Sequence, residues 1–160
     1  MIKAQIASVC EGFKKTNLNK IKDKDFKNKT ITTHLQLLKL KRAYEQAVED
    51  LRTVHITPVQ ENLEKVQALA REYEGEADAQ KRIEIRAKIN AFKDVDDAQI
   101  AFSKAMEKLG KEEVKIELIP LDKFIEEVYK EQDYDATVVD QLFPVFTYDA
   151  PASPKKPAKK

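Results

Sequence analysis

Apolar side chains recur at alternating spacings of three and four residues in the first half of the chain. They are Leu37, Leu40, Tyr44, Ala47, Leu51 and Val54. This spacing places one apolar stripe along an α-helix, as in a helix that packs on another helix. Thr30 or Thr32 can cap its first amides. We therefore expect a helix over residues 31–54, about 36 Å long at a rise of 1.5 Å per residue.

Pro58 interrupts this stripe. Because a proline clashes with the preceding helical turn, we expect a kink or a short break between Val54 and Val59. Thr57 as a cap and Pro58 at the first helical position indicate a fresh helix, which can still run roughly collinearly with the first. Its stripe ends at Gly75, a residue typical of helix ends.

A third apolar face follows Gly75, and a long helix is expected over residues 77–109. The face consists of Ile85, Ile89, Phe92, Phe102, Met106 and Leu109. Three aspartates, Asp94, Asp96 and Asp97, interrupt it midway. Since this helix matches the two preceding pieces in length, folding back at Gly75 predicts an antiparallel helical hairpin over residues 31–109.

The pattern changes at "GKEEVKIELIPLDKF", residues 110–124, where Val114, Ile116 and Leu118 alternate with charged residues. Alternation predicts a strand, which Pro120 would end because it lacks an amide donor. A strand needs a partner edge, and the best candidate in the chain is "IKAQI" at residues 2–6. Pairing with a strand of another protein is the alternative.

The other segments are short. Residues 16–29 are rich in Asn, Asp and Lys and are expected to form a loop, while Asp122 and Asp135 are expected to cap short helices. The predicted fold is mainly α: a long, coiled-coil-like antiparallel hairpin with a small α+β end formed by the termini. Residues 1–150 would form a single elongated domain, in which 1–30 and 111–146 make the compact end. Residues 151–160 would form a disordered Lys/Pro tail.

Composition agrees with long solvated helices. Charged residues make up 36% of the 160, hydrophobic ones 42%, and there is no Trp. No apolar run is long enough to span a bilayer and no signal peptide is recognisable, so we expect a soluble protein that makes no membrane contact. Cys10 lies at helical spacing from apolar neighbours and is expected to be a buried small hydrophobe.

The net charge of +1 conceals a strong polarity along the chain. Residues 1–42 carry eleven basic against three acidic side chains, whereas 43–150 carry fourteen basic against twenty-five acidic ones. Seven lysines are candidate contacts to nucleic acid phosphates: Lys14, Lys15, Lys20, Lys22, Lys24, Lys27 and Lys29. The alternative is a solvated loop that attracts the acidic part of the same or a neighbouring molecule. The absence of arginine among them argues against base readout.

Candidates for chemistry are few. His34 and His55 would lie ~30 Å apart on a straight helix, too far to share a metal, and both are expected on the helix surface. "DVDDAQ" at residues 94–99 lacks the glycine and the final glutamate of a calcium loop. No phosphate-binding loop, dinucleotide fingerprint or nucleophile elbow is present. We expect no catalytic residue, no metal and no cofactor, and hence no enzyme.

The order of these features resembles a family of small, uncharacterised bacteriophage and prophage proteins. The resemblance rests on "EVKIELIPL" followed by "DATVVDQLFPV", over residues 105–146, and more loosely on residues 31–73. It implies a phage origin and a role in virion structure, assembly or host interaction, in the cytoplasm of the infected bacterial cell or in the virion. The expected partners are proteins, either further copies of this chain or other phage or host proteins, and the expected contact seam is Leu37, Leu40, Tyr44 and Leu51.

Overall fold

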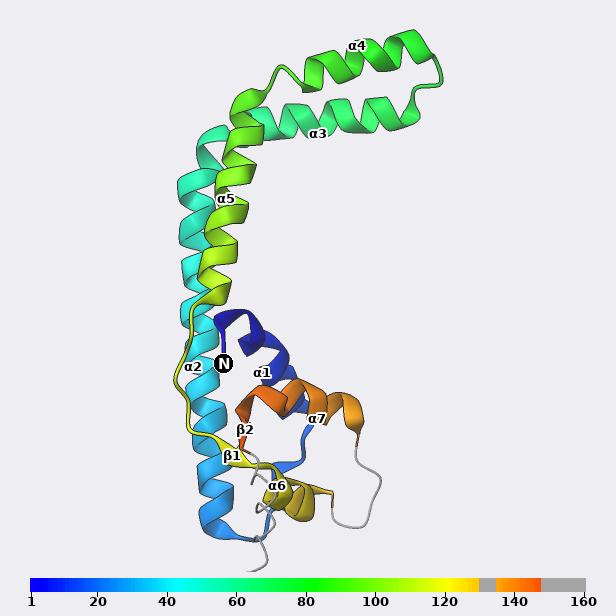
Figure 1. The fold of residues 1–160 in the computed structure, drawn as a ribbon. Helices are drawn as coiled ribbons and strands as arrows, with labels where there is room; N and C mark the ends of the chain where they lie inside the picture. The colour runs from blue at the N-terminus through cyan, green and yellow to red at the C-terminus, as the bar shows by residue number, and fades with distance from the viewer. Residues whose placement is uncertain (130–134, 148–160) are drawn as a thin grey trace, which may run out of the picture. The chain divides into compact units, whose positions relative to one another are not determined.

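The computed structural model describes residues 1–129 and 135–147, and in this part of the chain the fold is mainly α, as predicted (Figure 1). The chain forms two compact units. The first contains Met1–Ala43 and the described residues from Glu112 onward, and the second contains Tyr44–Lys111. Helix α2 (Lys24–His55) contributes residues to both. The predicted Lys/Pro tail lies outside the described residues.

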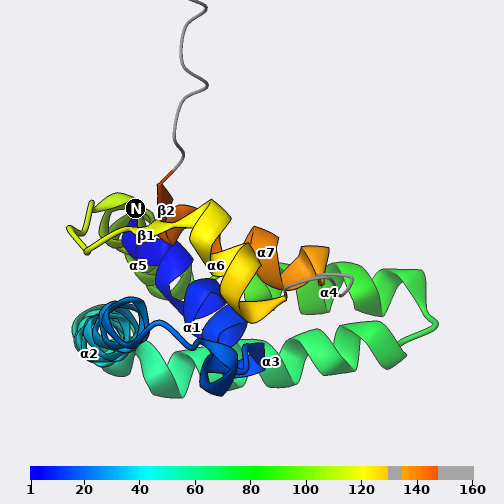
Figure 2. The ribbon, with the colours of Figure 1, turned by 90° about the horizontal axis from the view of Figure 1, so that it is seen from below.

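The first unit is built on helices from both ends of the chain. Helix α1 (Ile6–Lys15) packs against α7 (Ala136–Leu142), and α6 (Leu121–Val128) lies close to the short turn Leu18–Lys20 (Figure 2). Asp135 caps α7, as expected, by accepting bonds from the amides of Thr137 and Val138 at 2.9 and 3.3 Å. Asp122 instead lies in the first turn of α6, because the preceding Pro120 occupies the cap position.

The core of the first unit is apolar and joins residues that are distant in sequence. Its fully buried side chains include Ile6, Val9, Cys10, Leu37, Ile119, Phe124, Leu142 and Val145. The prediction for Cys10 is thus confirmed. Gly12 allows α1 to approach α7 closely, since a Cβ built there would lie 2.9 Å from Cγ of Leu142. Packing, rather than backbone conformation, explains this glycine.

Helix α2 begins earlier than predicted. Residues 24–29 are helical rather than loop, because Asp23 caps the helix: its Oδ1 accepts a bond from the Phe26 amide at 3.0 Å. The Thr30 hydroxyl does not act as a cap but donates to the Phe26 carbonyl at 2.8 Å. Thr33 donates to the Glu117 carbonyl at 3.2 Å, so both threonines are buried on the inner face of the helix.

The predicted strand pairing is largely wrong. Residues 115–118 form no regular strand, and the N-terminal segment pairs with this region at one antiparallel bridge, between Ile2 and Glu113. An ion pair between Lys3 and Glu112 at 2.7 Å lies beside the bridge. The next residues of the N-terminus turn into a 3₁₀ helix (Lys3–Gln5), in which the Gln5 side chain accepts a bond from the Ile2 amide. This turn takes the backbone away from further pairing.

A small parallel sheet forms further along the chain. Strand β1 (Ile119–Pro120) pairs with β2 (Phe146–Thr147), with Ile119 opposite Phe146. Strand β2 directly follows the 3₁₀ helix Phe143–Val145. Pro120 is the last residue of this ladder, opposite Thr147, and α6 begins at the next residue. A proline is tolerated there because the strand has only one paired edge.

The second unit contains the end of α2, α3 (Gln60–Gly75), α4 (Ala79–Ile89) and α5 (Lys93–Lys111). The break at Pro58 and the helix end at Gly75 are confirmed, and α3 and α4 pack side by side as a hairpin (Figure 1). Asp78 caps α4 through bonds from the amides of Gln80 and Lys81.

Four details of this unit differ from the prediction. Thr57 begins a 3₁₀ turn (Thr57–Val59) instead of capping α3, and Figure 1 shows that α3 is not collinear with the end of α2. The expected single helix over 77–109 is broken at residues 90–92. Asp94 and Asp96 thus lie in the first turn of α5, where carboxylates oppose the positive end of the helix dipole. Val54 is 64% exposed and is not part of an inner seam.

Candidate interaction surfaces

The predicted nucleic-acid lysines all lie in the first unit, and several of them contact its C-terminal part. Lys29 forms an ion pair with Glu117 at 3.3 Å, and Lys15 donates to the Gln141 side chain at 3.4 Å. The backbone amide of Lys22 donates to Glu127 at 2.7 Å. Of these three contacts, only the Lys29–Glu117 pair joins a cationic side chain to a carboxylate.

The remaining lysines of the set differ in their surroundings. Lys14 pairs with Glu11 within α1 at 2.6 Å, which lowers the pKa of the Glu11 carboxyl. Lys20, Lys22 and Lys24 have exposed side chains just before or at the start of α2, and Lys27 is half-buried. The structure thus gathers three exposed cationic side chains within five residues of chain.

The cap of α2 is tied to α6 by an ion pair. Lys123 donates to Asp23, the residue that also caps α2, and its ammonium lies 5.1 Å from the Phe26 ring centroid. The hydrogen bond from Lys123, and then that from the Phe26 amide, lower the pKa of the Asp23 carboxyl. The same contact raises the pKa of Lys123. The pair joins residues 100 positions apart and ties the start of α2 to α6.

The predicted contact seam does not form one surface. Leu37 is fully buried in the core of the first unit, and Leu40 is partly buried against that core. Tyr44 and Leu51 are half-buried and belong to the second unit. Leu37 therefore packs within its own chain, and only the other three retain surface for a partner.

His34 and His55, both predicted on the helix surface, are each half-buried, the second at the end of α2. The imidazole of His34 stacks on the Phe13 ring, with centroids 4.8 Å apart and an interplanar angle of 12°. Its Nε2 is buried and has no hydrogen-bond partner in the described parts of the chain. Burial, assisted by the nearby Lys14 charge, lowers the pKa of this imidazole. A nitrogen closed off in this way is not placed to transfer protons to a substrate.

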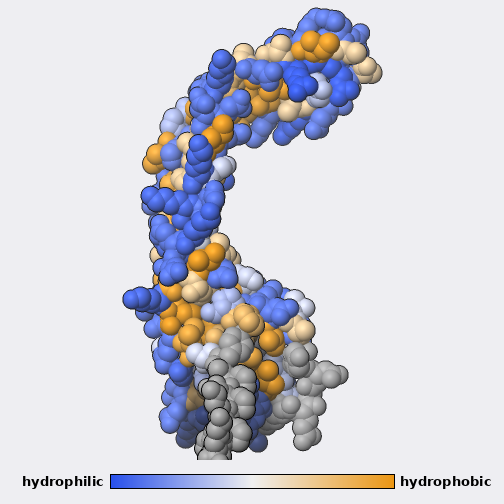
Figure 3. Space-filling view, in the orientation of Figure 1, coloured by the Kyte–Doolittle hydropathy of each residue, from blue (hydrophilic) through white to orange (hydrophobic). Residues whose placement is uncertain are grey.

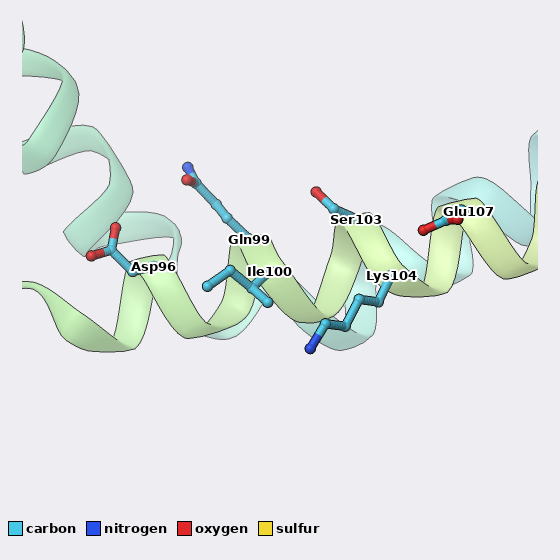
Figure 4. A pocket seen from close by; sticks show the side chains of 6 residues that line it. All are labelled: Asp96, Gln99, Ile100, Ser103, Lys104 and Glu107. Carbon is cyan, nitrogen blue, oxygen red and sulfur yellow. The ribbon is translucent and has the colours of Figure 1, made fainter.

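A shallow groove runs along α5, but its lining does not form an active site. Its residues are Asp96, Gln99, Ile100, Ser103, Lys104 and Glu107. All six come from one helix, and Figure 4 shows their side chains projecting away from it without converging. Glu107 is paired with Lys111, which lowers the pKa of its carboxyl. A catalytic site with two reacting groups and a bound substrate would need side chains from a second helix or strand that faces this groove.

A second groove lies on the α3–α4 hairpin and was missed by the sequence analysis. Its lining is Tyr73, Ala79, Arg82, Ile83 and Arg86, which we call the arginine groove. An adjoining hollow is lined by Tyr73, Arg86, Ile89 and Asn90. The Arg82 guanidinium stacks on the Tyr73 ring at 4.5 Å, and the neighbouring Ile83 is 62% exposed. Figure 3 shows apolar surface on this hairpin bordered by hydrophilic side chains.

Other kinds of site find no support in the described residues. Within residues 1–129 and 135–147, no three His, Cys, Asp or Glu side chains are grouped so as to hold a metal ion. No helix in these ranges is long and apolar enough to cross a membrane. Comparisons with protein-family models, with curated proteins and with solved structures find no match for this chain.

Proposed function

We propose that this chain is a non-enzymatic protein that acts through contacts with other proteins. The observation that carries the proposal is the α3–α4 hairpin, which presents exposed apolar and charged side chains together in the arginine groove. Apolar surface rimmed by charge is typical of protein-binding sites. The three hollows described above, by contrast, bring no pair of acid–base groups together on facing elements.

The proposed setting is a bacteriophage or prophage. It is supported by the resemblance of "EVKIELIPL" and "DATVVDQLFPV" to small phage proteins. The role would be in virion structure, in assembly or as an accessory factor, in the infected cell's cytoplasm or in the particle. The partners would be further copies of this chain or other phage or host proteins.

The test is to purify the tagged chain from bacteria carrying the phage and to identify cross-linked neighbours by mass spectrometry. We expect defined cross-links from lysines of this chain to one or a few proteins, and a complex of fixed mass by light scattering. A matched sample with Ile83→Asp controls for contacts outside the hairpin. A chain that remains a strict monomer and forms no reproducible cross-link contradicts the proposal.

A second candidate is a nucleic-acid accessory protein. It is favoured by the exposed side chains of Lys20, Lys22 and Lys24 near the start of α2. Binding through phosphates should weaken steeply with salt, because each neutralised phosphate releases a counterion. A gel-shift series from low to moderate salt should therefore show this loss, and replacing the three lysines with serine should flatten it. No binding at low salt eliminates this function.

A further inference from the structure

Helix α5 carries a stripe of exposed side chains on the side opposite the buried Val95 and Leu109. The stripe runs at spacings of three, four, four and three positions and consists of Lys93, Asp96, Ile100, Lys104 and Glu107. At about 100° of rotation per residue, all five lie within about 40° of Ile100 around the helix. Four of them line the shallow groove along α5, and Figure 4 shows Ile100 between Asp96 on one side and Glu107 on the other.

The stripe is symmetric about Ile100 in position and antisymmetric in charge. Asp96 lies four residues before Ile100 and Lys104 lies four residues after it. Lys93 and Glu107 lie seven residues before and after it. Every basic side chain thus has an acidic one at the same distance on the other side of Ile100. When two such stripes run antiparallel with Ile100 against Ile100, each lysine of one copy faces a carboxylate of the other.

We propose that this stripe binds the same stripe of a second copy of the chain, with the two α5 helices antiparallel and a two-fold axis at Ile100. The proposal rests on the proposed function, since it identifies one of the protein partners, but it uses a surface outside the arginine groove. A two-fold contact uses the same patch on both copies, so the patch must be complementary to itself. This stripe meets the requirement residue by residue, because its two kinds of lysine–carboxylate pair each form twice.

The charges of the stripe are available to a second copy. Lys93, Asp96 and Lys104 form no ion pair within residues 1–129 and 135–147. Glu107 pairs with Lys111 one turn further along, but its side chain is 64% exposed, and a carboxylate has lone pairs for a second lysine. Ile100 is 53% exposed and would lose its contact with water at the centre of the patch.

The order of the charges also sets the orientation of the two helices. In a parallel pair in register, each charged side chain would face the same side chain of the other copy, so every charged level would be repulsive. Such like-charge contacts suppress the wrong arrangement. Because the contact covers one face of about four helical turns, it belongs to the small and transient class of interfaces.

Disulfide trapping on the full-length chain under oxidised glutathione tests the register. The two thiols of Ile100→Cys meet at the two-fold axis, whereas those of Glu107→Cys are about 21 Å apart along the helices, too far for a disulfide. We expect Ile100→Cys to form a covalent dimer at least tenfold faster than Glu107→Cys or Lys93→Cys alone. An equimolar mixture of the last two variants should recover the fast rate. The native Cys10 is fully buried, and the unsubstituted chain measures its background.

Charge reversal tests the pairs themselves. Asp96→Lys and Lys104→Glu each place like charges on both sides of the axis, whereas their mixture, or one chain with both substitutions, has opposite charges there. Sedimentation equilibrium up to about 1 mM, where a Kd of about 0.1 mM gives mostly dimer, is the measurement. We expect the natural chain to approach twice its 18.4 kDa mass, each single variant to weaken association at least tenfold, and the mixture and the double variant to recover it. Lys108→Glu is the matched control, since Lys108 is exposed on the same helix about 80° around it from Ile100.

Three results would overturn the inference. The first is a natural chain that stays monomeric over the whole concentration range. The second is a Glu107→Cys variant that cross-links with itself as fast as Ile100→Cys, and the third is a dimer that both Asp96→Lys and Lys104→Glu leave intact. Circular dichroism verifies that each variant is helical. None of these results decides the proposed function, because cross-linking in bacteria that carry the phage detects other protein partners independently.

Discussion

Gly12 offers the sharpest test of how the two ends of the chain pack together. It is buried in the middle of α1, and an added Cβ would meet three atoms of α7. These are Leu142 Cγ at 2.9 Å, Leu142 Cδ2 at 3.0 Å and Gln141 Cβ at 3.1 Å. Carbon atoms in good contact lie about 3.5–4.0 Å apart. Gly12→Ala therefore requires α1 and α7 to separate or the Leu142 side chain to change rotamer.

The size of the effect follows from two opposing contributions. Replacing glycine by alanine inside a helix stabilises it by about 1 kcal/mol. Overpacking a filled core costs about 1–3 kcal/mol, and Leu142 is fully buried, so it has no open space to move into. We expect Gly12→Ala to lower the free energy of unfolding by about 1 kcal/mol. Gly12→Val, with two more methyl groups and poorer helix propensity, should lower it by about 3 kcal/mol.

Urea unfolding followed by circular dichroism gives these free energies, and hydrogen exchange shows whether the loss is confined to α1 and α7. Ala7→Gly is the matched control, because Ala7 is an exposed position of the same helix and reports helix propensity alone. If Gly12→Ala stabilises the protein by the amount that Ala7→Gly destabilises it, then the close contact between α1 and α7 does not exist.

Three further perturbations probe the first unit. The pKa of His34 is lowered by burial, so its contribution to stability is complete above the ordinary value near 6.5 and declines as pH falls from there toward the folded-state pKa. The urea midpoint of the natural chain should therefore fall between pH 7.5 and pH 5, and this fall should be smaller in His34→Phe. An equal fall in the variant and the natural chain would contradict this reasoning. Asp23→Ala should lower the midpoint more than Asp23→Asn, because asparagine keeps the cap of α2 and loses only the ion pair with Lys123. Ile116→Lys should lower the melting temperature, because Ile116 packs against the apolar core; an unchanged value would show that this side is solvated.

The long helices could be predicted because spacings of three and four persist over many turns, but the start of α2 could not. Its buried face continues toward the N-terminus through Phe26, Thr30, Thr33 and Leu37, at the same spacings. Two of these residues are threonines, which count as polar in a hydrophobic pattern. Their hydroxyls are satisfied by carbonyls of Phe26 and Glu117, and the second of these is a tertiary contact that only the fold reveals.

The sheet was harder to predict for a different reason. Strands β1 and β2 have two residues each, too few for any alternation to show. The apolar alternation at 114–118 instead reflects side chains that touch the core from an irregular segment, since Val114 and Ile116 pack against it and Leu118 is 39% exposed. A period of two was thus real, and the inference from it to a paired strand was wrong.

The arginine groove was missed because its residues come from two helices and include no recognised motif. Ile83 carried the available signal: it falls outside the apolar face that contains Ile85 and Ile89, in a helix otherwise rich in charge. The stacking of Arg82 on Tyr73 depends on the turn at residues 76–78, whose geometry the pattern does not specify.

The composition of the first unit has a consequence for synthesis on the ribosome. Its core needs Ile6 and Val9 from one end of the chain and Leu142 and Val145 from the other, whereas residues 44–111 form the second unit from one uninterrupted stretch. Because chains emerge N-terminus first, the second unit can fold while α1 still waits with its apolar face uncovered. A ribosome that stalls before residue 136 would release a chain whose α1 has no α7 to cover it. We expect such truncated products to recruit chaperones or to aggregate, although their central helices are already formed.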